Sequence, residues 1–205
     1  MNTSCSRREF FSRLAQSACG LGVCGLFTPA AAMAQEEIPP VEARFYKKLP
    51  DARIRCEICP KECEIADLER GYCGNKENRK GIYYSLVYGR CCSAHVDPIE
   101  KKPLFHYLPS TGAFSIAAAG CNFECKFCQN WRIAQYRPEQ VDGFYLPPRE
   151  VVSLAREKKC PTIAYTYSEP VVFYEYMHDT AQLGRREGIG SVMISNGFIN
   201  EKPLM

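Results

Sequence analysis

The stretch of sequence that decides the fold runs from the apolar segment Ala113-Phe-Ser-Ile-Ala-Ala-Ala119 through Gly120 into Cys121-Asn-Phe-Glu-Cys125-Lys-Phe-Cys128. The segment 113–119 carries no charge, as a strand buried in a parallel sheet requires. Three cysteines follow within one short loop, and the next cysteine along the chain is Cys160. A buried strand that leads straight into a cysteine loop predicts a metal or cluster site at the end of that strand.

The spacing of these three cysteines distinguishes between the kinds of metal site that the loop could form. Zinc sites usually combine two separate C-x2-C pairs, and two-cluster ferredoxins use C-x2-C-x2-C-x3-C-P. Three thiolates on a [4Fe–4S] cube leave one iron open, and an open metal position is where a substrate or cofactor binds in catalytic metal sites. The loop therefore predicts chemistry rather than plain electron storage.

The segments after the loop alternate between strand and helix. The apolar runs predict parallel strands, and Pro147-Pro148 and Pro170 are well placed to open helices. Alternation of this kind is typical of βαβ units, whose ligands bind at the carboxyl ends of the strands. We expect strands over 113–119, 162–167 and 191–195, with helices over 147–159 and 170–188.

A second group of cysteines lies upstream. Cys56, Cys59, Cys63 and Cys73 have the spacing of a tetrahedral zinc site or of an iron–sulfur cluster, and the spacing does not choose between them. Two disulfides are the alternative, although three cysteines within eight residues make good disulfide geometry difficult. We expect a separate metal site in a small, loop-rich module.

Composition and the N-terminal sequence limit the kinds of function that the chain could have. The chain has 205 residues, 46% of them apolar and 13 of them cysteine, and its formal charge of +3 is too small to predict a nucleic-acid partner. Arg7-Arg8 ahead of an uncharged stretch and Ala32-Met33-Ala34 is typical of a twin-arginine signal, which predicts periplasmic export of a folded protein, or a cytoplasmic location if the signal is retained. The stretch is too weakly apolar to form a stable membrane span, and we expect no such span after processing. The predicted organisation is a leader over 1–34, a linker over 35–51, the cysteine-rich module over 52–108 and an α/β domain over 109–205.

The loop Cys121–Cys128, with Phe127 directly before its last cysteine, resembles the signature loop of radical S-adenosylmethionine (SAM) enzymes. The segments Cys128-Gln-Asn-Trp131 and Val96–Phe105 and the upstream module are similar to the AmmeMemoRadiSam-system branch. That branch is related to the enzymes that activate pyruvate formate-lyase by making a glycyl radical. The resemblance covers roughly residues 52–205.

The resemblance implies roles for particular residues. Cys121, Cys125 and Cys128 would hold a [4Fe–4S] cluster whose open iron binds SAM, and Phe127 would lay its backbone against the adenine. The cluster would cleave SAM reductively to a 5′-deoxyadenosyl radical, with electrons from a flavodoxin- or ferredoxin-like donor. The substrate would be a glycine on a partner protein or a small molecule. No side chain is predicted as a general acid, base or nucleophile.

The same resemblance assigns residues after the second and third strands. Glu169 matches the carboxylate that holds the SAM ammonium, although Tyr167 and Ser168 replace the two glycines usual before it. The alternative for Glu169 is an exposed helix cap. Asn196 and Gly197 match the position that contacts the ribose, and a plain Asn-Gly turn is the alternative there.

The family fold implied is a partial (β/α)6 barrel, of which this chain would supply the N-terminal part. Residues 113–205 hold three strands, so we expect a C-terminally truncated chain that binds a cluster but does not turn over. The rival prediction from another functional class is a non-catalytic iron–sulfur electron carrier or metal-binding module, which has no need for SAM.

Overall fold

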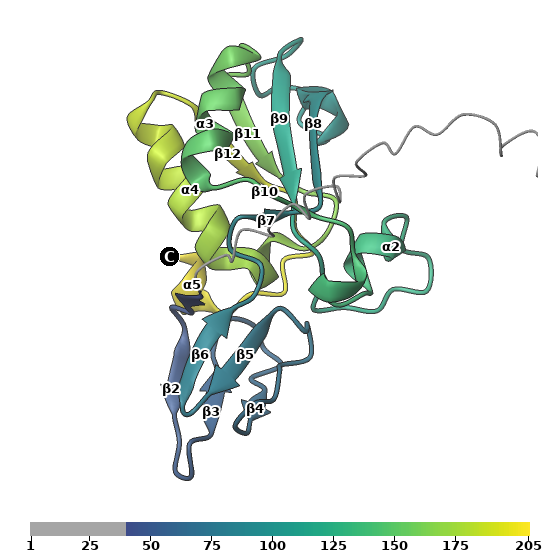
Figure 1. Ribbon diagram of the computed structural model, residues 1–205. Helices are drawn as coiled ribbons and strands as arrows, with labels where there is room; N and C mark the ends of the chain where they lie inside the picture. Colours follow the sequence, from purple (N-terminus) through teal and green to yellow (C-terminus); the bar gives the residue numbers. More distant parts are fainter. Residues whose placement is uncertain (1–39) are drawn as a thin grey trace, which may run out of the picture. The chain divides into compact units, whose positions relative to one another are not determined.

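The computed structural model describes residues 40–205, and the predicted leader lies outside them. Its largest sheet has four strands in the order β12-β11-β9-β8 (Figure 1). The central pair is parallel, with Thr162 opposite Ala113, and β12 is parallel to β11. The strands are β8 (Ser93–Pro98), β9 (Gly112–Ala117), β11 (Thr162–Tyr165) and β12 (Gly190–Met193). The three predicted parallel strands are therefore present and adjacent.

Two long helices cover one face of this sheet, as Figure 1 shows. They are α3 (Pro148–Glu157) and α4 (Tyr174–Arg186), the latter preceded by the short helix η3 (Pro170–Phe173). Pro148 and Pro170 occupy first helical positions, where the missing N–H costs nothing. Both predicted helices are thereby confirmed. The remaining short elements are η1 (Ile99–Lys101), α2 (Trp131–Ala134), η2 (Pro138–Gln140), β10 (Phe144–Tyr145) and α5 (Glu201–Leu204).

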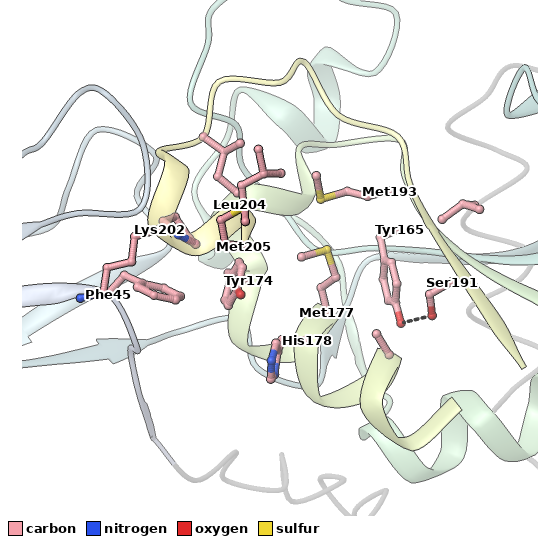
Figure 2. A pocket seen from close by; sticks show the side chains of 14 residues that line it. Phe45, Tyr165, Tyr174, Met177, His178, Ser191, Met193, Lys202, Leu204 and Met205 are labelled. Carbon is pink, nitrogen blue, oxygen red and sulfur yellow. Dashed lines mark hydrogen bonds between the residues drawn. The ribbon is translucent and has the colours of Figure 1, made fainter. Parts of the chain in front are cut away.

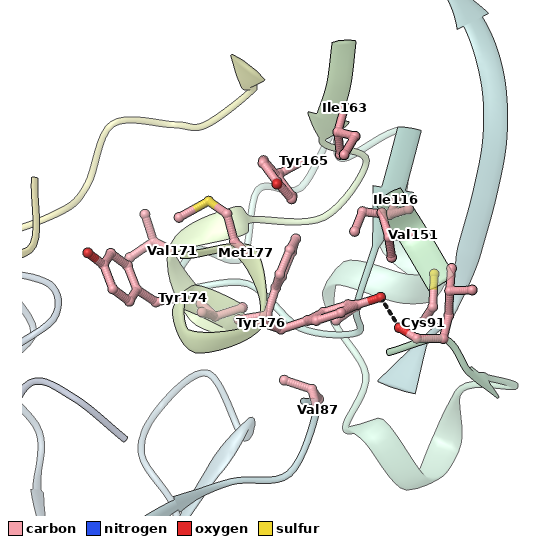
Figure 3. Close-up of a cluster of buried hydrophobic side chains, with 14 of the residues drawn as sticks. Val87, Cys91, Ile116, Val151, Ile163, Tyr165, Val171, Tyr174, Tyr176 and Met177 are labelled. Carbon is pink, nitrogen blue, oxygen red and sulfur yellow. Dashed lines mark hydrogen bonds between the residues drawn. The ribbon is translucent and has the colours of Figure 1, made fainter. Parts of the chain in front are cut away.

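The core lies between the sheet and these helices (Figure 3). Ile116 and Ile163 of the sheet pack against Val151 of α3 and Tyr176 of α4, and all four are fully buried. The Tyr176 phenol donates to the Leu146 carbonyl, so its buried hydroxyl has a partner. Met177 belongs to the same cluster.

The N-terminal module consists of short antiparallel strands in sheets ordered β1-β6-β5 and β2-β3-β4, while β7 pairs with β10. Residues 41–48, expected to be linker, instead supply β1 and β2, because Val41 and Tyr46 find backbone partners in β6 and β3. The strands are β1 (Val41–Glu42), β2 (Tyr46–Lys48), β3 (Ile54–Cys56), β4 (Glu64–Ile65), β5 (Lys76–Arg79), β6 (Ile82–Ser85) and β7 (Arg90–Cys91).

Two features of the main sheet differ from expectation. Its fourth strand, β8, was not expected; it ends at Asp97 and Pro98 and pairs antiparallel with β9 along its whole length. The four-stranded sheet also stays open in the part of the chain that the structure describes, so the partial barrel is not confirmed. The chain is a mixed α/β protein. No helix within residues 40–205 is both long and apolar enough to span a membrane.

Candidate functional site

The cysteine loop begins at Gly120, three residues after β9 ends at Ala117. This glycine has φ of +98°, and a Cβ there would overlap the side-chain amide of Asn75 in the module. The Asn75 side chain also donates to the carbonyl of Ala119. Glycine is required here both by the left-handed backbone and by the close approach of a second segment. The module therefore supports the first residue of the loop directly.

The three cysteines of the loop are half-buried and free. The Phe123 N–H donates to Cys121 Sγ at 3.3 Å, and the Cys128 N–H donates to the Cys125 carbonyl at 3.1 Å. Burial raises the pKa of the Cys121 thiol, and the nearby Glu169, Cys125 and Cys128 raise it further. The loop thus holds three thiols near one another with a backbone donor already directed at one sulfur.

The donor set fits an iron–sulfur cluster. Thiolates are the usual ligands of such clusters, and N–H donors to the ligating sulfurs tune their potential. Among residues 40–205, no three His, Cys, Asp or Glu side chains are arranged to hold a single metal ion. A cluster distributes its ligands over several irons, so the three cysteines need not meet at one point.

Glu169 lies at the end of β11 and is only 3% exposed. It caps η3 by accepting the Val171 N–H at 3.1 Å, so the cap is present but buried rather than exposed. The Ser195 hydroxyl donates to the same carboxylate at 2.7 Å, and the Asn196 N–H donates at 2.9 Å. The carboxylate therefore joins the ends of β11 and β12.

Asn196 extends this network to the cysteine loop. Its side-chain amide donates to Asn122 Oδ1 at 2.8 Å and lies 4.0 Å from Cys121 Sγ. The adjacent Gly197 has φ of +74° and has open space where a Cβ would be. Glu169, Asn196 and Cys121, far apart in the sequence, are thus brought together at the carboxyl ends of the parallel strands.

Phe127 does not join that cluster of contacts. Its side chain is 91% exposed, the most exposed of the aromatic side chains in the described part of the chain. A role through its backbone stays a prediction. The other site roles drawn from the resemblance are likewise predictions.

Sequence reasoning missed the residues that connect these parts. Asn122 lies between Cys121 and the segment after β12, where its amide also donates to the Phe198 carbonyl at 2.9 Å. Asn130 donates from beyond the cysteine loop to the Tyr167 carbonyl at 2.8 Å. The one signal of these connecting contacts in the sequence was Tyr167, which replaces a glycine before Glu169.

The upstream cysteines also come together. The Cys56 N–H donates to the Cys63 carbonyl at 3.0 Å, and Cys56, Cys59, Cys63 and Cys73 contact the same buried core. All four are free thiols. Burial raises the pKa of Cys56 and Cys59, and it raises that of Cys73 to about 12. Asn122 lies close enough to Cys59 to lower the pKa of its thiol, so this group lies beside the cysteine loop.

A pocket of about 530 Å³ lies elsewhere, between α4, β12 and α5 (Figure 2). Phe45, Met177, Met193 and Leu204 give it an apolar lining, and the half-buried His178 lies at its wall. None of the predicted site residues lines it. The chemistry predicted from the sequence therefore belongs to the strand ends and not to this pocket.

Comparison with known proteins finds similarity over part of the chain. Residues 115–204 match the Radical SAM superfamily. The chain is 50% identical over 163 residues to "Uncharacterized protein MJ0808" of Methanocaldococcus jannaschii, covering 80% of this chain and 49% of that protein. It is 32% identical over 108 residues to "Uncharacterized protein MJ0674" of the same organism, covering 51% of this chain and 27% of that protein.

The chain thus spans about half the length of the first curated relative and about a quarter of the second. No solved structure matches it significantly. The similarity to that superfamily covers less than half of the chain's 205 residues. It suggests chemistry that uses a [4Fe–4S] cluster and SAM.

Proposed function

We propose that this chain supports reductive cleavage of SAM and is of the AmmeMemoRadiSam-system type, similar to the activating enzymes of glycyl-radical proteins. The observation that carries the proposal is the meeting of the Cys121 loop, the Glu169 carboxylate and Asn196 at the carboxyl ends of β9, β11 and β12. When bound, a [4Fe–4S] cluster supplies the electron that splits SAM into methionine and a 5′-deoxyadenosyl radical. The protein provides orientation and excludes water.

Each residue has a defined task in this proposal. Cys121, Cys125 and Cys128 hold the cluster. Glu169 accepts the SAM ammonium, and its bonds from Ser195 and Asn196 fix the direction of the carboxylate. Burial makes this carboxylate a stronger partner for a cation than an exposed one, because water competes less.

Asn196 and Gly197 contact the ribose, since their turn leaves open space beside Gly197. The Phe127 backbone lies against the adenine. The electron donor is a flavodoxin- or ferredoxin-like protein. The substrate is a glycine of a partner protein or a small molecule that can lose a hydrogen atom.

The decisive experiment is anaerobic reconstitution followed by electron paramagnetic resonance with and without SAM. We expect a reduced [4Fe–4S] signal that SAM alters. Changing Cys121, Cys125 or Cys128 to Ala abolishes this signal, whereas Cys160→Ala, at a buried cysteine outside the loop, leaves it in place. A triple variant that keeps a SAM-responsive signal would refute the assignment. A cluster indifferent to SAM would instead favour the non-catalytic iron–sulfur carrier.

We also propose a separate structural metal site at Cys56, Cys59, Cys63 and Cys73. Its support is that all four are free thiols and that all four pack against the same buried core. In the full chain, the Cys121/Cys125/Cys128 triple Ala variant should retain bound metal, and adding Cys56→Ser and Cys59→Ser should remove it. Metal analysis distinguishes zinc from iron. A triple variant devoid of metal, with four titratable thiols in the module, would contradict the proposal.

A further inference from the structure

Tyr167 has the backbone conformation of a glycine. It lies two residues after Tyr165, the last residue of β11, and has φ of +67°, in the left-handed region that residues with a Cβ rarely adopt. Residues held in this way persist only where the surrounding structure fixes them, and they gather at functional sites. The contacts of Tyr167 identify what fixes it.

The Tyr167 side chain is held by a buried charged group on β8 and the segment after it. Its hydroxyl donates to the Asp97 carboxylate, which also accepts Lys102 Nζ at 2.6 Å and Lys101 Nζ at 2.8 Å. Lys102 Nζ lies 4.5 Å from the centre of the Tyr167 ring. The side chains of Asp97 and Lys102 are 9% and 2% exposed, so both charges are removed from water and depend on one another.

The Tyr167 backbone is tied to the opposite side. Its carbonyl accepts the Asn130 amide, two residues beyond Cys128. Next to it, the Ser168 N–H donates to the Thr166 carbonyl at 2.9 Å, and the Ser168 hydroxyl donates to the Ala118 carbonyl. Two residues after Tyr167 comes Glu169, whose carboxylate bonds to Ser195 and Asn196. One residue therefore connects β8, the end of the cysteine loop and the turn that carries Glu169.

We propose that Tyr167, anchored by Asp97 and Lys102, is a positioning residue that fixes the turn before Glu169 and so holds that carboxylate in place for the SAM ammonium. The inference rests on the proposed function, because it acts through Glu169. A glycine would adopt the same backbone without strain but would leave the turn free to move. The tyrosine accepts the strained conformation because its hydroxyl and ring find fixed partners in the Asp97 group.

The test compares Tyr167→Phe with Tyr165→Phe in the reconstituted full chain. Tyr165 is the last residue of β11, two residues before Tyr167, and its hydroxyl faces Ser191 Oγ at 3.4 Å, outside the Asp97 group. The measurements are cluster content, thermal unfolding and the dissociation constant of SAM by calorimetry. We expect Tyr167→Phe to load the cluster and to bind SAM roughly tenfold more weakly, since a hydrogen bond to a charged group is lost. Tyr165→Phe should bind SAM like the unaltered chain.

Tyr167→Gly keeps the proposal testable if the Phe variant fails to fold, because it relieves the left-handed strain while removing the anchor. We expect it to fold and load the cluster with weakened SAM affinity, and the SAM-induced change in the resonance spectrum should need a higher SAM concentration. Unchanged SAM affinity in folded Tyr167→Gly or Tyr167→Phe would overturn this inference and leave the proposed function standing. An unaltered chain that loads a cluster and shows no response to SAM would overturn the proposed function and this inference with it.

Discussion

Asp97 is a buried carboxylate whose charge is kept by its neighbours. Burial alone would raise the pKa of Asp97, but hydrogen bonds from Lys101, Lys102 and Tyr167 and the charge of Lys102 lower it well below its ordinary value of 3.8. A carboxylate with a lowered folded-state pKa contributes stability above its unfolded pKa, and the protein loses that contribution as the pH falls. The cluster-free chain should therefore lose stability as the pH drops below about 4.

Denaturant unfolding between about pH 6 and pH 2 measures this loss. Asp97→Asn should be less stable than the unaltered chain by about 1–3 kcal/mol near pH 6, and its stability should fall less steeply in acid. Asp142→Asn, at an exposed carboxylate, serves as the control. It should change neither the stability near pH 6 nor the loss of stability in acid. Equal acid slopes for Asp97→Asn and the unaltered chain would show that Asp97 is not the group responsible.

At the scale of elements, the turn from β9 into the cysteine loop depends on Gly120. Gly120 and Gly188 both have positive φ, at +98° and +73°, but only Gly120 has another segment where a Cβ would lie. Gly188→Ala should lower the free energy of unfolding by about 1–2 kcal/mol through backbone strain alone. Gly120→Ala should lower it more, because the added methyl also displaces Asn75 from the Ala119 carbonyl.

The comparison is made by urea unfolding of both variants and by their cluster content after reconstitution. Gly120→Ala should also lower cluster loading, since the displaced segment leads directly into Cys121, whereas Gly188→Ala should load normally. Equal costs and equal loading for the two variants would contradict the role given to Asn75.

The elements that sequence patterns predicted are those with strong local signals. The uncharged run before Gly120 and the prolines that open α3 and η3 are sufficient to place those strands and helices. β8 escaped prediction because its edge position leaves His95 and Val96 exposed, and the strand is defined by pairing with β9. The Asp97–Tyr167 contact joins residues 70 positions apart, so no local pattern contains it. The cysteines of the site were visible in the sequence, while the residues that position the site were not.

At the scale of the whole of residues 40–205, a buried ion pair joins the N-terminal module to helix α4. Lys76 of β5 and Glu175 of α4 lie 2.8 Å apart with side chains 2% and 1% exposed. Burial alone would lower the pKa of Lys76, but the charge of Glu175, the Cys56 thiol and the hydrogen bond to Glu175 raise it instead. Glu175 also accepts the Arg44 N–H at 3.1 Å, so three segments meet at one carboxylate.

Removing one partner of such a pair leaves the other charge buried without compensation. Lys76→Met should therefore cost about 3–5 kcal/mol in urea unfolding. The double variant Lys76→Met/Glu175→Gln should cost much less, since no charge remains inside and the Gln carbonyl still accepts the Arg44 N–H. Arg156→Met, at the exposed pair with Glu187, is the matched control and should cost less than about 1 kcal/mol. If the costs of Lys76→Met and Glu175→Gln simply add in the double variant, the two charges do not depend on each other, and the ion pair is not what joins the module to α4.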